Sequence, residues 1–199
     1  MRFEVSPAVF ELLPDACFGV VAVKGADNSK PIPEVSALLH ESIAACEKAL
    51  EGSKVKESPE IVPYRDAFRA LNINPNKFMC SIEALLTRIA KGKGFPEISP
   101  VVDFGNAVSL KYRLPIGEAE TPEPDEVVYV SDGQVRTRRW TWRQSEIGKI
   151  TPETTDLLFP IDGFTSVNLD RVLAARAELA EGLERYFCAK TAVGLVDKD

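Results

Sequence analysis

The residues best suited to chemistry lie in one short segment, from Arg136 to Gln144. This segment holds four arginines and both tryptophans of the chain within nine residues. Between Arg136 and Lys149 there are five basic residues and one acidic residue, a local charge of +4 in a chain of net charge −6. An arginine guanidinium can form two parallel hydrogen bonds to a phosphate, and a tryptophan ring offers a stacking surface for a base. The segment therefore predicts contacts with RNA.

The same segment has an alternative interpretation as an ordinary strand. Side chains alternate along a strand, so Arg136, Arg138, Trp140 and Trp142 would share one face. Tryptophan is highly buried on average, and the arginines would then only be solvated.

A second basic group follows a predicted helix. Arg88, Lys91 and Lys93 lie around Gly92 and Gly94, and glycine allows a phosphate to approach the backbone closely. The alternative role is a helix C-terminal cap, where positive charge is favourable. The GxxxxGK[ST] spacing of a phosphate-binding loop is absent.

Two isolated polar residues complete the candidates. Asn106 follows Asp103-Phe104-Gly105 at the predicted entrance to a helix, where its amide can bind a polar ligand group or cap the helix. His40 is the only histidine, so histidine-based acid–base catalysis has a single candidate. We interpret His40 as structural.

The four cysteines are far apart and form no CxxC pair: Cys17, Cys46, Cys80 and Cys188. This spacing does not suit a zinc site, and neither a metal nor a cofactor is expected. We interpret all four as buried small hydrophobic residues rather than as disulfides. Only Cys80, just before a predicted helix, is a candidate reactive thiol.

The elements that must position these residues mix helices and strands. Apolar runs predict strands at 18–23 and 157–161 and a short strand at 98–103. Apolar spacing predicts helices at 34–50, 59–71, 81–89, 106–112 and 168–187, and Ser81 suits the N-cap of its helix. Asp132-Gly133 between the β-rich runs 127–130 and 135–141 predicts a hairpin. This order predicts one layered domain over 1–199, with sheets covered by helices.

Composition limits the class of protein. The 199 residues are 45% hydrophobic and 27% charged, which is typical of a globular domain rather than a disordered chain. No run of 18 apolar residues and no signal pattern is present, so we expect a cytoplasmic protein without membrane contact. A pI of about 5.0 argues against broad nucleic-acid binding but leaves room for a local basic site.

Several motifs, in order, resemble the editing domain of the phenylalanyl-tRNA synthetase β chain. The first runs from Ser99 to Leu110 and continues to Leu114-Pro115-Ile116-Gly117. The second is Val130-Ser131-Asp132-Gly133, and the third runs from Ile150 to Leu158. The resemblance is strongest over 81–162. The chain resembles a free-standing version of that domain, of which the Arg139–Gln144 motif is typical.

The resemblance implies an α/β (α+β) fold with a β-sandwich-like sheet core flanked by helices, and it implies hydrolysis of the ester between a wrong amino acid and tRNA. Asn106 matches the asparagine of the editing pocket. The neighbouring threonine is replaced by Gly105, the pocket histidine falls at Gly117, and the pocket acid falls near Pro160. Asp162 lies two residues further along and shares the face of Pro160 on a strand.

The first functional hypothesis is a trans-acting aminoacyl-tRNA deacylase. Asn106 and backbone N–H groups would hold the amino acid or the ester carbonyl while water attacks, with help from a ribose hydroxyl. The substrate would contact Gly105, Gly117, Trp140, Trp142 and Gln144. The backbone phosphates of the tRNA acceptor end would bind Arg138, Arg139, Arg143 and Lys93.

Two other hypotheses remain open. The same pocket would suit a module that binds an RNA end, an amino acid or another small ligand without catalysis, which the missing histidine and acid favour. The third is a structural domain whose arginines only solvate a sheet.

Overall fold

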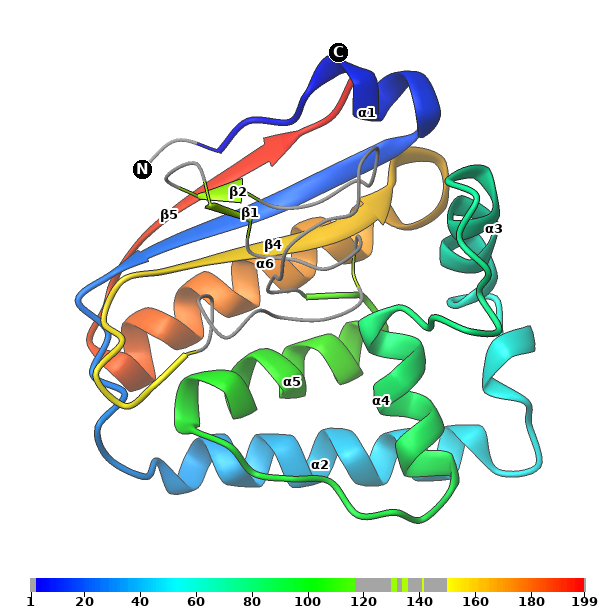
Figure 1. Ribbon diagram of the computed structural model, residues 1–199. Coiled ribbons are helices and arrows are strands. Elements are labelled where there is room, and N and C mark those ends of the chain that lie inside the picture. The colour runs from blue at the N-terminus through cyan, green and yellow to red at the C-terminus, as the bar shows by residue number, and fades with distance from the viewer. Residues whose placement is uncertain (1–2, 117–129, 132–133, 136–140, 142–149, 199) are drawn as a thin grey trace.

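The computed structural model describes residues 3–116, 130–131, 134–135, 141 and 150–198 (Figure 1). In chain order the elements are α1 (Pro7–Leu12), β1 (Ala16–Lys24), α2 (Pro33–Leu50), the 3-10 helix η1 (Val55–Glu57), α3 (Val62–Ala70), α4 (Ser81–Ala90), α5 (Pro100–Tyr112), β2 (Val130–Ser131), β3 (Gln134–Val135), β4 (Leu157–Phe164), α6 (Thr165–Phe187) and β5 (Lys190–Val196). The predicted mixture of helices and strands is confirmed.

The main sheet has β1 at its centre, paired antiparallel with β4 on one side and with β5 on the other. Gly19 lies opposite Ile161 of β4 and Leu195 of β5. The strands predicted at 18–23 and 157–161 are confirmed as β1 and β4. The sheet core flanked by helices is also confirmed for this one sheet, whereas a second sheet that would complete a sandwich remains a prediction.

One face of the sheet is covered by α6, and α5 lies between α6 and α2 (Figure 1). The contact between α6 and the sheet is close because Gly19 and Gly163 have no side chains there. A Cβ atom on Gly19 would lie 2.8 Å from a methyl carbon of Val172, and one on Gly163 only 2.4 Å from the other methyl carbon. The sheet, α6, α5 and α2 therefore follow one another in closely packed layers.

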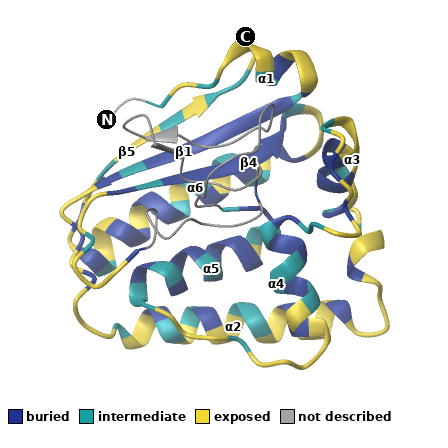
Figure 2. Ribbon diagram, viewed as in Figure 1, coloured by how far each residue is buried: buried dark blue, intermediate teal, exposed yellow. Residues whose placement is uncertain are grey.

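The opposite face of the sheet carries an aromatic group near α1. The Phe18 ring packs against Phe10 of α1 and against Phe3, at centroid distances of 6.2 and 6.4 Å. Figure 2 shows the resulting pattern, with buried residues along β1 and β4 and with exposed residues gathered on the outer side of α2. The helix predicted at 34–50 is thus an amphipathic surface helix, α2.

The starts of α5 and α4 differ from the prediction. Residues 98–103 do not form a strand, because α5 already begins at Pro100, and proline suits the first position of a helix. The Asp103 carboxylate accepts a hydrogen bond from the Ile98 N–H at 2.9 Å, which ties the preceding chain to the first turn. In α4 the N-cap is Cys80, so Ser81 is the first helical residue and not the cap.

The predicted hairpin is confirmed at four residues. Val130 pairs with Val135 and Ser131 with Gln134, in antiparallel register. The strand predicted to continue to Thr141 is wrong at that residue, because Thr141 has a φ of 57°, in the left-handed region. The strand-like alternation expected across the Arg/Trp segment therefore does not hold at Thr141.

The last predicted helix is α6, which begins three residues earlier than expected. Asp15 holds this start, because its carboxylate accepts hydrogen bonds from the Ser166 N–H at 3.1 Å and from the Thr165 hydroxyl. Asn168 interrupts the helical backbone with φ −147° and accepts a hydrogen bond from the Phe164 N–H at 2.7 Å. No helix in the described part of the chain is both long and apolar enough to cross a membrane.

Candidate functional site

Asn106 lies in the middle of α5, so it is neither at a helix entrance nor a cap. At 3.6 residues per turn, it is about 200° around the helix from Phe104, which faces α6. Its side chain is half-buried, and it makes no hydrogen bond to another described residue. The amide therefore has both its donor and its acceptor free, among the described residues, to hold a polar group of a ligand.

Gly105 has a packing role beside Asn106. A Cβ atom at Gly105 would lie 3.3 Å from a ring carbon of Phe159 in β4, which is tighter than most side-chain contacts. The absence of a side chain leaves room for the Phe159 ring, which extends from β4 to the backbone of α5. The threonine that the resemblance places here would require the Phe159 ring to move.

A buried polar centre forms where β4 meets the chain that follows α5. The Asp162 N–H donates to the Pro115 carbonyl at 3.1 Å, and Ile116 forms a β-bridge with Ile161. The Tyr64 hydroxyl donates to the Asp162 carbonyl at 2.9 Å, and Asn168 donates its side-chain N–H to the Tyr64 oxygen at 3.0 Å. The side chains of Asp162, Tyr64 and Asn168 are all buried, those of Asp162 and Tyr64 completely. We call this group, with Cys80, the Asp162 centre.

Burial is the main reason that Cys17, Cys80 and Tyr64 have raised pKa values. Burial, together with the nearby Asp162 charge, raises the pKa of Cys17 to about 12. Burial and the Glu83 and Asp162 charges also raise the pKa of Cys80 to about 12. Burial, with smaller effects from Cys80 and Asp162, raises the pKa of Tyr64 well above its usual value.

Three of the four cysteines are buried, and the fourth is exposed. A thiol with a pKa near 12 is not a thiolate at neutral pH, so the predicted reactivity of Cys80 is wrong. Cys17, Cys46 and Cys80 are buried as predicted, but Cys188 is exposed. Cys188 follows α6 in a left-handed conformation with φ 52°, so it is the C-cap of that helix and lies outside the core.

Thr141 connects the Arg/Trp segment to this region. Its carbonyl accepts a hydrogen bond from the Ser81 N–H at 2.6 Å, at the first residue of α4. Thr141 is only 2% exposed. Cys80, one residue before Ser81, belongs to the Asp162 centre. The middle of the Arg/Trp segment is thus attached next to the buried polar residues.

Lys93 lies beyond the other end of α4. The ten residues of that helix span about 15 Å, so the structure does not bring Lys93 together with Thr141. Arg88 donates hydrogen bonds to the Gly94 and Lys93 carbonyls, at 2.7 and 3.3 Å. The helix C-cap interpretation of this basic group is therefore the one that the contacts favour.

Seven predicted site residues lie outside the described residues: Gly117, Arg138, Arg139, Trp140, Trp142, Arg143 and Gln144.

His40 is exposed on α2, and a ring nitrogen lies 3.0 Å from a carboxylate oxygen of Glu97. That contact fits the structural role predicted for His40.

Several buried polar residues were not singled out from the sequence, among them Tyr64, Asn168 and Asn28. Tyr64 and Asn168 support the Asp162 centre, and nothing in their spacing marks them. Asn28 accepts a hydrogen bond from the Val101 N–H and donates one to the Thr151 carbonyl, both at 3.0 Å. Asn28 thereby joins the first and the third motif of the resemblance. In the sequence, only its position in a polar loop could have indicated a capping role.

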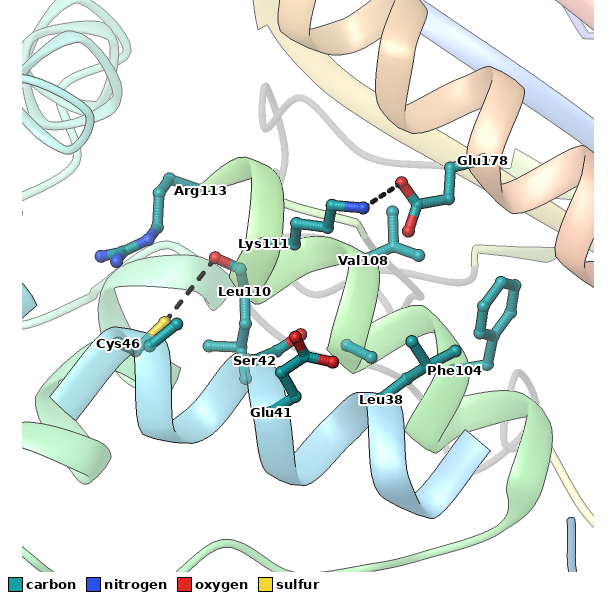
Figure 3. Close-up of a pocket in the computed structure, with 12 residues that line it drawn as sticks. Leu38, Glu41, Ser42, Cys46, Phe104, Val108, Leu110, Lys111, Arg113 and Glu178 are labelled. Atoms are coloured by element: carbon teal, nitrogen blue, oxygen red, sulfur yellow. Dashed lines mark hydrogen bonds and ion pairs between the residues drawn. The ribbon is translucent and has the colours of Figure 1, made fainter. Parts of the chain in front are cut away.

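A separate cavity of about 220 Å³ lies between α2, α5 and α6 (Figure 3). Its walls are mainly apolar, and its polar side chains include the ion pair between Lys111 and Glu178, at 2.6 Å. Neither Gly105 nor Asn106 lines it, since they are on other sides of α5. The cavity is therefore distinct from the pocket that the sequence predicted.

Comparison of the chain with models of protein families, with curated proteins and with solved structures found no match. The interpretation of the site therefore depends on the residues described above.

Proposed function

We propose that this protein is a trans-acting aminoacyl-tRNA deacylase, which hydrolyses the ester between a wrong amino acid and tRNA. The observation that carries this proposal is that segments of the resemblance, distant in sequence, lie along β4. Gly105 packs on Phe159, and Pro115 and Ile116 contact Asp162 and Ile161. An editing pocket requires such segments to be close in space.

Asn106 is the residue proposed to act on the substrate. Its half-buried amide would donate a hydrogen bond to the ester carbonyl, whose oxygen becomes negatively charged when water attacks. A terminal ribose hydroxyl of the tRNA would help to orient the water. An aminoacyl ester is already activated, so positioning without a side-chain base can suffice.

Asp162 is proposed to organise the pocket rather than to touch the substrate. It lies on the same face of β4 as Pro160, where the resemblance places an acidic residue. Its side chain is completely buried, and its backbone joins Tyr64 to Pro115. This arrangement would hold β4 and the chain after α5 in a fixed relation.

The Arg/Trp segment is the proposed contact with the tRNA acceptor end. Arg138, Arg139 and Arg143 would bind phosphates, and Trp140 or Trp142 would stack on the terminal base. The enzyme would act in the cytoplasm, where aminoacylated tRNA is used.

One observation favours a second candidate, a module that binds the same ligands without hydrolysis. Among the described residues, no side chain that could act as a general base is placed beside Asn106: Cys80 and Asp162 are buried, and His40 lies on the exposed surface of α2, where it pairs with Glu97. Such a module would bind an RNA end or an amino acid in the pocket beside Asn106 and release it unchanged.

The experiment that separates the two candidates is single-turnover deacylation. The protein in excess is mixed with a panel of tRNAs, each carrying a labelled non-cognate amino acid, and ester loss is compared with a sample without protein. Faster loss from one or a few pairs supports the deacylase. Saturable binding that weakens with salt, with no ester loss from any pair, supports the binding module.

A further inference from the structure

The helices α2 and α5 face each other across the cavity, and small side chains leave part of the space between them unfilled (Figure 3). Ala45 and Cys46 of α2 and Ala107 of α5 all line the cavity. Protein interiors hold few voids larger than a water molecule, because an unfilled void costs packing energy. The volume of about 220 Å³ therefore makes this cavity a candidate ligand site.

The inner wall of the cavity is apolar. Phe104 and Val108 are each 1% exposed, and Leu110 is completely buried. The Cys46 thiol is also buried, and it donates a hydrogen bond to the Leu110 carbonyl with a sulfur–oxygen distance of 3.7 Å. An apolar cavity of about 150 Å³ can take up benzene. The larger volume here therefore leaves room for a ring of that size and one small polar group.

Arg113 is the cation of the cavity lining that has no partner among the described residues. Lys111, the other cation, lies 2.6 Å from a carboxylate oxygen of Glu178, so these two charges offset each other. Arg113 makes no ion pair and no side-chain hydrogen bond to any residue that the structure describes. Burial raises the pKa of Cys46 and the Arg113 charge opposes that rise, so the guanidinium lies near the Cys46 end of the cavity.

These charges favour a ligand with a single negative charge. The Arg113 guanidinium can form two parallel hydrogen bonds to one carboxylate. Two acidic side chains, Glu41 and Glu178, belong to the same lining. Like charges repel, so these glutamates would disfavour a dianion such as a phosphate monoester more than a monoanion.

We propose that the cavity binds a small monocarboxylate with an apolar body about the size of one ring. The carboxylate pairs with Arg113, and the apolar body lies against Phe104 and Val108. Asn106 does not line the cavity and lies on another side of α5. The site is therefore separate from the pocket of the proposed deacylase, and it does not rest on that function.

The probe for this site is benzoate. Benzyl alcohol is its matched control, because it keeps the ring and replaces the carboxylate with an uncharged hydroxymethyl group. Titration followed by ligand-observed NMR gives the dissociation constant of each compound. We expect benzoate to bind saturably and benzyl alcohol to bind about tenfold more weakly, the factor that corresponds to one lost hydrogen-bonded charge contact.

Two variants locate the site. Ala45→Phe places a ring in the cavity from an exposed position of α2. Ala44→Phe is its matched control, because Ala44 is exposed on the same helix and does not line the cavity. Arg113→Asn removes the guanidinium, and asparagine accepts the positive φ of 56° at this helix C-cap. We expect Ala45→Phe to abolish benzoate binding, Ala44→Phe to leave it unchanged, and Arg113→Asn to weaken it about tenfold.

A wild-type protein that shows no saturable benzoate binding at millimolar concentrations would overturn the proposal. Benzoate binding that persists in a folded Ala45→Phe variant would do the same, and equal affinity for benzyl alcohol would overturn the role of the carboxylate. Circular dichroism establishes folding. Should Ala45→Phe fail to fold, the Arg113→Asn titration decides, because an unchanged benzoate affinity there would overturn the proposed pairing. A protein that binds benzoate but hydrolyses no aminoacyl-tRNA would keep this site and refute only the proposed function.

Discussion

Arg65 and Glu83 form a buried ion pair beside the Asp162 centre. Arg65 donates to the Glu83 carboxylate at 2.6 Å, to the Pro75 carbonyl at 3.0 Å and to the Asn76 side-chain oxygen at 2.6 Å. Burial raises the pKa of Glu83 despite the opposing effect of the Arg65 charge. The pair is therefore held by surrounding hydrogen bonds as well as by its own attraction.

Removal of one partner of this pair should destabilise the fold strongly. We expect Arg65→Met to lower the free energy of unfolding by about 3–5 kcal/mol, because Glu83 would be left as an uncompensated buried group. The double variant Arg65→Met with Glu83→Leu should regain most of that loss. Urea unfolding gives the free energy of unfolding of the single and of the double variant. A double variant that is no more stable than Arg65→Met would contradict this account.

Asp15 gives a prediction with a defined pH dependence. Burial raises the pKa of Asp15, but the hydrogen bonds from Ser166 and Thr165 lower it by more. The net pKa therefore lies below the ordinary 3.8. A group with a lowered pKa stabilises the fold above its ordinary pKa and loses that effect as the pH falls through the folded value. The contribution of Asp15 should therefore be complete at pH 7 and should decrease below about pH 3.8.

The corresponding measurement compares Asp15→Ala with the wild type in urea at pH 7 and at pH 3. We expect a loss of about 1 kcal/mol at pH 7, the usual value for a helix cap, and a smaller difference at pH 3. Asp170→Ala, which removes an exposed acid on α6 itself, is the control. A difference that stays constant with pH would show that the charge of Asp15 is not what holds the start of α6.

At the residue scale, the sequence identified residues that belong to a motif. It missed residues whose role lies only in hydrogen bonds to distant parts of the chain. Asn106 was singled out by its position in a motif, and the structure leaves its amide without a partner among the described residues. Tyr64, Asn168 and Asn28 were missed because the hydrogen bonds that join them to other parts of the fold reach partners 98, 104 and 123 residues away. Contacts over such separations cannot be inferred from spacing.

At the element scale, the crossing of α5 and α6 depends on one small residue. A Cβ atom on Gly182 would lie 2.0 Å from the tip of the Phe104 ring, so the two helices approach as closely as glycine allows. Helix propensity alone would predict that alanine stabilises α6 by roughly 1 kcal/mol.

We expect the opposite sign at this crossing. Gly182→Ala should lower the free energy of unfolding by about 1–3 kcal/mol, because the added methyl forces Phe104 out of its packed position. Phe104→Leu in the same chain should relieve the overlap, so that the double variant loses less than the sum of the two single changes. Additive losses in thermal or urea unfolding would count against this explanation.

Elements with long apolar patterns could be predicted from the sequence. Elements whose start depends on a helix cap, or whose formation depends on a neighbouring strand, could not. The patterns at 18–23, 34–50 and 168–187 correspond to β1, α2 and α6. The start of α5 was missed because Val101 and Val102 suggest a strand, whereas Pro100 and Asp103 fix a helix. β5 was missed because its residues are mostly exposed and follow directly after a long helix.

For the whole molecule, the sheet order could not be read from the chain. β1 pairs with β4 and β5, which lie more than 130 residues further along, and this pairing brings Asp162 beside Phe18. The approach of Gly105, Pro115 and Ile116 to β4 follows from that order. The proposed pocket is thus a product of tertiary packing, although its motifs are visible in the sequence.

The central claim is that the Asn106 amide acts in ester hydrolysis. The most direct test is the deacylation rate of Asn106→Ala on the tRNA pair that the wild type hydrolyses fastest, with circular dichroism to show that the variant is folded. Tyr112→Phe is the matched control, because it removes a polar group from the same helix, the hydroxyl that donates to Glu178. The account predicts a loss of about 10²–10³-fold for Asn106→Ala, as for an oxyanion donor, and an unchanged rate for Tyr112→Phe. A folded Asn106→Ala variant that hydrolyses the ester at the wild-type rate would contradict it.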